Sequence, residues 1–260
     1  MKGSFFELGL GGCRLEDVFV VDCHAHVGPR VQVDPDASLG TLLADMERIG
    51  IDRTVCACFP PTMGSYPYEG NDFVAEAVRR CPDRLSGYAY INPNYPELNM
   101  EELERRFGGE SFSGIKVHLH GGRPYDDPLY EPIYGFAHEW GLPVLAHTWG
   151  PETVRTLGRM AERFPGARFL VGHADVCDPE VLAEEAGRAD NLYFVVCSSV
   201  AGPDAVARMV EAVGAERVLW GSDTMLLSPG HQIGKVLFAD LDDNVKRTIL
   251  GGNARKVFRL

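Results

Sequence analysis

Short apolar runs rich in β-branched residues recur along the chain from about residue 18 onward. Several of them, such as VLWG and RFLVG, are apolar almost without interruption, which is typical of strands that are covered on both faces. The pattern predicts eight strands: Val18–Cys23, Arg53–Cys58, Leu85–Ile91, Gly114–His120, Pro143–His147, Arg168–His173, Leu192–Val196 and Arg217–Gly221.

The segments between these runs have the periodicity of amphipathic helices. A helix is predicted over 39–49, because apolar residues recur three and four positions apart between Ser38, a good N-cap, and Gly50, a good helix end. Another is predicted around 154–160, with Pro151 in its first turn. The chain therefore alternates strand and helix.

Regular β–α alternation with right-handed crossovers produces a parallel sheet that is either closed or doubly wound. Eight repeats in 260 residues favour closure, so we expect the α/β class and one (β/α)₈ TIM barrel in a single domain. No G-x-G-x-x-G follows the first strand, which weakens the open dinucleotide-binding alternative. We assign 18–260 to the barrel and 1–17 to an N-terminal extension.

Composition narrows the classes of function. The formal net charge of −12 argues against nucleic-acid binding, which needs clustered Lys and Arg, and we expect a small-molecule substrate instead. No apolar run is long enough for a membrane span, and the start lacks the pattern of a signal peptide. Seven cysteines without a C-x-x-C pair are best explained as buried, reduced thiols. These features predict a soluble, cytoplasmic protein.

The candidate chemistry lies at strand ends. Imidazoles or carboxylates occur at the C-terminal ends of strands one, four, five, six and eight, and in a barrel those ends meet on one face. His24 and His26 stand two residues apart, so on a strand both would point to one side and could hold one ion. Taken singly, each histidine could equally be a hydrogen-bonded polar group at a strand end. The joint placement predicts a metal-centred active site.

The motifs VDCHAH, PVLAHTWG, FLVGHAD, VLWGSD and ILGGNARKVF resemble the amidohydrolase superfamily, and within it the amidohydrolase-2 branch of metal-dependent hydrolases and aromatic-acid decarboxylases. The resemblance implies that His24, His26, His147 and Asp223 bind one divalent metal, usually Zn²⁺, with Mn²⁺ or a binuclear site as alternatives. It also implies that His173 is the catalytic imidazole, with Asp223 sharing the proton transfer.

Strand four leaves two alternatives open. Lys116, His118 and His120 alternate, and we expect all three to point inward towards the mouth. By the resemblance, Lys116 is either a carbamylated bridge between two metals or, as we favour, an unmodified lysine available for acid–base chemistry. His118 or His120 would then contact the substrate.

We expect hydrolysis of a small amide, ester or lactone through a metal-activated water. The alternative is a metal-dependent, non-oxidative decarboxylase of an aromatic or unsaturated acid. That substrate needs a cationic clamp, for which Arg30 and Arg123 are candidates. Trp149, Tyr66 and Tyr125 lie in predicted loops and could stack on an aromatic ring.

Two hypotheses from other classes of function, a nuclease and a non-catalytic barrel, are weaker. A TatD-like nuclease would carry G-E-x-G-L-D near the middle of the chain, and this sequence has no such motif. A non-catalytic barrel would lack ligands, whereas all five expected positions are occupied. By the resemblance, a homo-oligomer is a further expectation.

Overall fold

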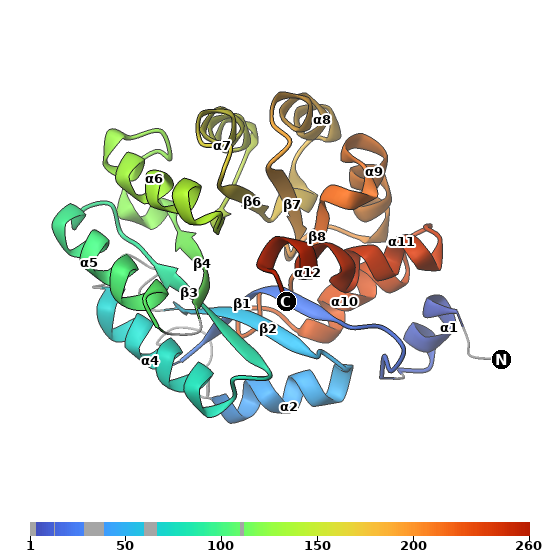
Figure 1. Ribbon diagram of the computed structural model, residues 1–260. Coiled ribbons are helices and arrows are strands. Elements are labelled where there is room, and N and C mark those ends of the chain that lie inside the picture. The colour runs from blue at the N-terminus through green and yellow to red at the C-terminus, as the bar shows by residue number, and fades with distance from the viewer. Residues whose placement is uncertain (1–3, 13, 29–38, 60–66, 110–111) are drawn as a thin grey trace.

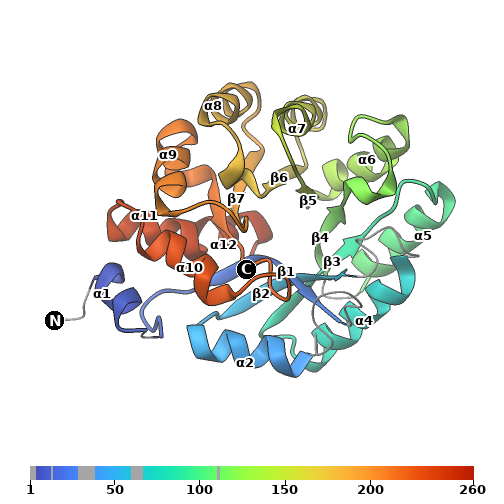
Figure 2. The same cartoon turned by 180° about the vertical axis from the view of Figure 1, so that it is seen from behind.

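The computed structural model describes residues 4–12, 14–28, 39–59, 67–109 and 112–260. In this part of the chain, strands alternate with helices around a central sheet (Figure 1; Figure 2). The strands are β1 Val21–Val27, β2 Arg53–Cys58, β3 Leu85–Tyr90, β4 Phe112–Val117, β5 Pro143–His147, β6 Arg168–Gly172, β7 Leu192–Val196 and β8 Val218–Trp220. The helices are α1 Phe5–Leu10, α2 Leu39–Ile49, α4 Pro67–Arg80, α5 Pro96–Phe107, α6 Glu131–Trp140, α7 Pro151–Arg163, α8 Pro179–Arg188, α9 Pro203–Val213, α10 Pro229–Leu237, α11 Asp243–Arg247 and α12 Asn253–Phe258.

The eight strands are parallel and pair in sequence order from β1 to β8. A parallel bridge between Ala25 and Thr224 joins the first strand to the residues that follow the last one. This arrangement confirms the single-domain (β/α)₈ TIM barrel. Proline opens α4, α5 and α7 to α10, a position where its missing N–H leaves no helical hydrogen bond unmade.

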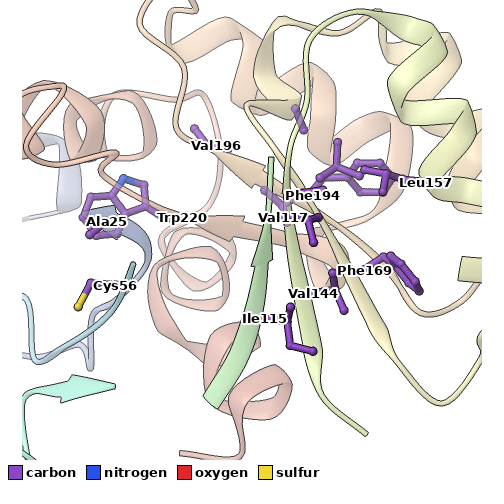
Figure 3. Packing of buried hydrophobic residues seen from close by; sticks show 14 of the residues in the cluster. Ala25, Cys56, Ile115, Val117, Val144, Leu157, Phe169, Phe194, Val196 and Trp220 are labelled. Atoms are coloured by element: carbon purple, nitrogen blue, oxygen red, sulfur yellow. The ribbon is translucent and has the colours of Figure 1, made fainter. Parts of the chain in front are cut away.

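Buried apolar side chains form two layers. The outer layer lies between strands and helices, and Figure 3 shows part of it, including Ile115 and Phe169 on strands and Leu157 on α7. Cys56 belongs to this layer together with Cys58, so both point to the same side of β2, as alternation predicts. The inner layer fills the barrel, and residues of α12, including Phe258, pack into it and close the end opposite the strand C-termini.

The first strand contains a β-bulge. Asp22 pairs with Thr54 and Ala25 pairs with Cys56, so β1 has one residue more than β2 over this stretch. Within the bulged stretch Cys23 belongs to the inner layer, and Ala25, where the pairing resumes, belongs to the outer layer. The bulge therefore lets His24 and His26 lie on the inner side although the inner residue Cys23 directly precedes His24.

Several predicted strand limits were wrong. The first strand starts at Val21 and runs to Val27, so His24 and His26 lie within it rather than beyond its end. The fourth ends at Val117, because His118 caps a short 3₁₀ helix over Leu119–Gly121. His118 and His120 therefore belong to the loop after β4 and do not continue its alternation.

The N-terminal extension packs beside the barrel. In its described part, the ring of Phe6 in α1 meets the ring of Phe238, the residue after α10, edge to face with centroids 5.5 Å apart. The backbone N–H of Phe5 donates to Asp243 of α11 at 3.3 Å. The described chain contains no helix that is long and apolar enough to cross a membrane.

Candidate metal centre and active site

Hydrogen bonds that close the barrel also bring the candidate ligands together. The Asp223 N–H donates to the carbonyl of His24 at 2.7 Å, and the His26 N–H donates to the carbonyl of Thr224 at 2.7 Å. The seam between β1 and the loop after β8 therefore fixes both histidines and the aspartate relative to one another. Asp22 strengthens this seam, because its carboxylate accepts hydrogen bonds from the N–H and hydroxyl of Ser222.

The donor atoms of His24, His26 and Asp223 have spacings that fit one metal ion. Asp223 Oδ1 lies 3.3 Å from His26 Nε2 and 3.6 Å from His24 Nε2. Ligands held tetrahedrally at about 2.0–2.1 Å from one ion lie roughly 3.3–3.4 Å apart. Asp223 Oδ1 is buried and has no hydrogen-bond partner among the described residues, which is costly unless something electropositive binds it. The three residues fit a divalent cation.

His147, the fourth expected ligand, occupies a different place. It ends β5, and its ring stacks on His118 with centroids 4.2 Å apart and meets His173 at 4.5 Å. The metal-compatible group formed by His24, His26 and Asp223 does not include it in the described part of the chain. Its role as a ligand stays a prediction.

Six of the eight histidines form one row of rings across the barrel mouth. From His26 the row passes to His24, His173, His147, His118 and His120, with centroid separations between neighbours of 5.6, 5.0, 4.5, 4.2 and 4.3 Å. His118 is buried and His120 is exposed at the outer end. The structure thus places the sequence-predicted imidazoles on one face, as the positions of the strand ends indicate.

The site favours neutral imidazoles. Burial lowers the pKa of His24, His147 and His173, and the Lys116 charge lowers each of them further. The carboxylate of Asp223 acts in the opposite direction on His173 and raises its pKa in part. Neutral imidazole is the form that binds a metal, so the environment favours metal binding by His24 and His147.

Lys116 lies fully inside the barrel. Its Nζ is 3.0 Å from His24 Nε2, the nitrogen that faces Asp223. Burial lowers the pKa of Lys116 to about 8, while Asp223 acts in the opposite direction. The lysine therefore places a cationic or readily discharged amine at the candidate metal centre. Carbamylation of Lys116 stays an untested alternative.

Backbone strain and close packing also concentrate at the site. His173 and Asp223 have φ values of 61° and 50°, in the left-handed region that few non-glycine residues adopt. Gly221 is needed for a different reason, because a Cβ there would lie 2.6 Å from the Cβ of His24. The missing side chain at Gly221 lets His24 pack closely against the end of β8.

The other candidate substrate contacts are placed less centrally. Arg123 is half-exposed and donates to Asn94 and Asp127, at 2.7 and 3.0 Å, so its guanidinium is already used in the loop. Trp149 is 60% exposed.

Tyr125 is buried, and its hydroxyl donates to the carbonyl of His147 at 2.7 Å. This hydrogen bond makes Tyr125 a support for the end of β5 rather than a surface on which a substrate ring could stack. Arg30 and Tyr66 lie outside the described residues.

Sequence reasoning missed a polar network behind the imidazoles. Asp175 accepts hydrogen bonds from the N–H groups of Cys197 and Ser198 and forms a buried ion pair with Lys235 of α10, at 2.9 Å. Cys197 Sγ in turn lies 3.2 Å from His24 Nδ1. Asp175 stands in the motif FLVGHAD, but no pattern in the sequence connects it with Cys197 or Lys235.

Comparisons with known proteins identify the family. A family model described as Amidohydrolase (Amidohydro_2) matches residues 21–260. The chain belongs to the amidohydrolase-2 family. The resemblance in the strand-end motifs is thereby confirmed.

The relatives of this chain have two kinds of name. A 4-sulfomuconolactone hydrolase from Rhizobium radiobacter is 25% identical over 238 residues, which cover 78% of this chain and 74% of that protein. A gamma-resorcylate decarboxylase from Polaromonas sp. is 22% identical over 249 residues, covering 73% and 75%. A solved 5-carboxyvanillate decarboxylase from Novosphingobium aromaticivorans, complexed with manganese and 4-hydroxy-3-methoxy-5-nitrobenzoic acid, superimposes with a TM-score of 0.79 at 19% identity, covering 94% of this chain and 97% of that one.

These names correct the expected reaction. One relative is a hydrolase, but gamma-resorcylate decarboxylases recur among the curated relatives and 5-carboxyvanillate decarboxylases recur among the structures of the same fold. The expectation of a hydrolase is therefore wrong as the main prediction, and its decarboxylase alternative is favoured. The physical reason is that ligands at the strand ends are compatible with both reactions, so these motifs alone do not distinguish them.

Proposed function

We propose that this amidohydrolase-2 enzyme is a metal-dependent, non-oxidative decarboxylase of a small aromatic acid. The observation that carries the proposal is the alignment with a gamma-resorcylate decarboxylase over 249 residues, which spans most of both chains. The buried Lys116 supports it, because a cation beside the candidate metal centre suits an anionic substrate.

In the proposed reaction the bond between the ring carbon and the carboxylate breaks and CO₂ leaves. The ring carbon then keeps the electron pair and takes up one proton, so the reaction consumes no water and needs no oxidant. The enzyme must bind a planar anion, stabilise charge on it and deliver a proton to carbon.

We assign these tasks to residues of the site. His24, His26 and Asp223 would hold the divalent ion, with His147 as a predicted fourth ligand. When bound, the ion supplies positive charge that orients the substrate's carboxylate or phenolate oxygens. Lys116 adds a cation on the same side, and His173 and Asp223 are the groups proposed to exchange the proton with the ring carbon.

The finer assignments belong to this proposal. Manganese is the metal named with the 5-carboxyvanillate decarboxylase, so we propose Mn²⁺ or Zn²⁺ as the occupant, one ion per chain. A small-molecule substrate is the proposed partner. The six cysteines in the described ranges are all free, which supports the proposed cytoplasmic location.

The test is product analysis in deuterated water. The Mn²⁺-loaded enzyme is incubated in D₂O with gamma-resorcylate and with 5-carboxyvanillate, and CO₂ and aromatic product are measured. We expect equal amounts of both, with one deuterium on the carbon that carried the carboxylate. His173→Asn is expected to slow turnover by about 10²–10⁴-fold, the usual contribution of a general acid–base.

A matched control is His231→Asn, because His231 is exposed on α10. It should retain the rate of the unmodified enzyme. If neither these acids nor other hydroxybenzoates release CO₂, while a lactone is opened with incorporation of ¹⁸O from water, the proposal is refuted.

A further inference from the structure

The thiol of Cys197 lies between two histidines of the site. It follows β7, is fully buried, and has its Sγ 3.2 Å from His24 Nδ1 and 3.5 Å from His173 Nδ1. The backbone N–H of His173 also donates to this sulfur, at 3.2 Å. One sulfur thus contacts an expected ligand and the expected proton-transfer residue.

The hydrogen on His24 can be assigned from its partners. His24 Nε2 faces the Lys116 ammonium at 3.0 Å and Asp223 Oδ1 at 3.6 Å. An ammonium only donates, and a metal ion held between His24 and Asp223 needs a lone pair on the nitrogen, so in either case Nε2 carries no hydrogen. Neutral His24 then carries its hydrogen on Nδ1, where sulfur is the acceptor.

The hydrogen on His173 follows from the first assignment. Since the sulfur accepts from His24, its own S–H is available for one acceptor. His173 Nδ1 at 3.5 Å is closer than the alternative acceptor, the carbonyl of Val195 at 3.9 Å. When Nδ1 of His173 accepts, its hydrogen must be on Nε2. The two imidazoles then have opposite tautomers.

The position of the thiol is fixed from outside the site. The Asp175 carboxylate accepts from the N–H groups of Cys197 and Ser198, at 3.2 and 3.1 Å. Lys235 pairs with that carboxylate at 2.9 Å, and both partners are buried. Since the backbone at Cys197 is held in this way, its sulfur has little freedom to leave the two rings.

We propose that Cys197 is a positioning residue that sets opposite tautomers on two active-site histidines. Its sulfur accepts the Nδ1–H of His24, which leaves Nε2 free to bind metal, and its S–H donates to His173 Nδ1, which leaves an N–H on Nε2 that can donate a hydrogen bond to the substrate. The second half of this inference rests on the proposed function, whereas the first half concerns metal binding alone.

The first test needs no variant. Long-range ¹H–¹⁵N spectra of protein labelled with ¹⁵N-histidine distinguish the two neutral tautomers. We expect His24 to show the Nδ1–H form and His173 the Nε2–H form, both with and without a bound metal. Identical tautomers on the two rings would overturn the proposal.

The second test measures metal affinity without substrate. Apo-protein is titrated with Co²⁺ against a competing chelator, comparing Cys197→Ala, Cys197→Ser and the unmodified protein. Loss of a partner that orients a ligating histidine typically weakens metal binding by about 10–100-fold, so we expect that loss in Cys197→Ala. Serine, whose hydroxyl also accepts and donates, should recover most of the affinity.

Cys56→Ala is the matched control, because Cys56 is equally buried in β2 but belongs to the outer layer. It should bind Co²⁺ as the unmodified protein does. Affinity within twofold of the unmodified protein for Cys197→Ala, or a sulfur-to-cobalt charge-transfer band that reveals a thiolate ligand, would overturn the proposal. Because no substrate is used, an enzyme that fails to release CO₂ but behaves as expected here would refute only the proposed reaction.

Discussion

Replacing Lys235 by methionine tests the network behind the active site. Lys235 and Asp175 are 2% and 0% exposed in their side chains, and the Lys235 Nζ also donates to the carbonyl of Ser198. Methionine keeps much of the volume but leaves the Asp175 charge buried without its cation. Removing one partner of a buried pair costs about 3–5 kcal/mol, because the remaining charge is no longer compensated.

The matched control is Lys256→Met. Lys256 and Glu216 form an exposed pair, with side chains 73% and 71% accessible, and such pairs contribute about 0–1 kcal/mol. In a domain of roughly this size, 1 kcal/mol shifts Tm by about 2–4 °C. We therefore expect Lys235→Met to lower Tm by roughly 6–20 °C and Lys256→Met by at most about 4 °C.

Differential scanning calorimetry and urea unfolding of the metal-free protein measure these changes. The double variant Asp175→Asn with Lys235→Met removes both charges, so it should be more stable than Lys235→Met alone. If Lys235→Met and Lys256→Met unfold within about 1 kcal/mol of each other, the Asp175–Lys235 pair does not stabilise the site and the reasoning fails.

Three further substitutions test separate parts of the site. Gly221→Ala places a Cβ 2.6 Å from that of His24, so we expect loss of metal binding in a chelator competition, whereas Gly230→Ala, whose nearest contact would be 3.7 Å away, should bind normally. Lys116→Met removes a charged hydrogen-bond donor worth about 1.5–3 kcal/mol, so kcat/KM for an aromatic acid should fall roughly 10–150-fold, and an unchanged value would exclude Lys116 from substrate binding. Arg123→Ala should change kcat/KM by less than about threefold in the same assay, since ordinary surface substitutions act within ±0.5 kcal/mol; a larger loss would restore Arg123 as a clamp.

The barrel itself was predictable because its strands are buried on both faces. That burial produces continuous apolar runs, and β2, β5 and β7 have the limits that those runs predict. The start and end of β1 were not predictable in this way. Its inner side becomes polar at the mouth, where His24 and His26 face the site, so the apolar signal stops at Cys23 while the strand continues to Val27.

The predicted end of the fourth strand was wrong for the opposite reason. The alternation of Lys116 and His118 continues the pattern of a strand although the ladder ends at Val117. The ring of His118 accepts a hydrogen bond from the N–H of His120 at 3.1 Å, and Gly122 adopts a φ of 74° that ends the turn. A local cap of this kind competes with the sheet and leaves no mark in a period-two pattern.

The ligands and their supports differ in how far the sequence reveals them. His24 and His26 lie in the C-terminal half of β1, and Asp223 follows β8. The topology of a barrel brings such positions together, and this does not depend on which side chains lie between them in the sequence. The supports meet only through packing, since Asp175 reaches Cys197 across 22 residues and Lys235 across 60. Each of these residues is ordinary when read alone. The fold therefore predicts where an ion would bind, whereas the state of the imidazoles that bind it depends on contacts that only the three-dimensional structure shows.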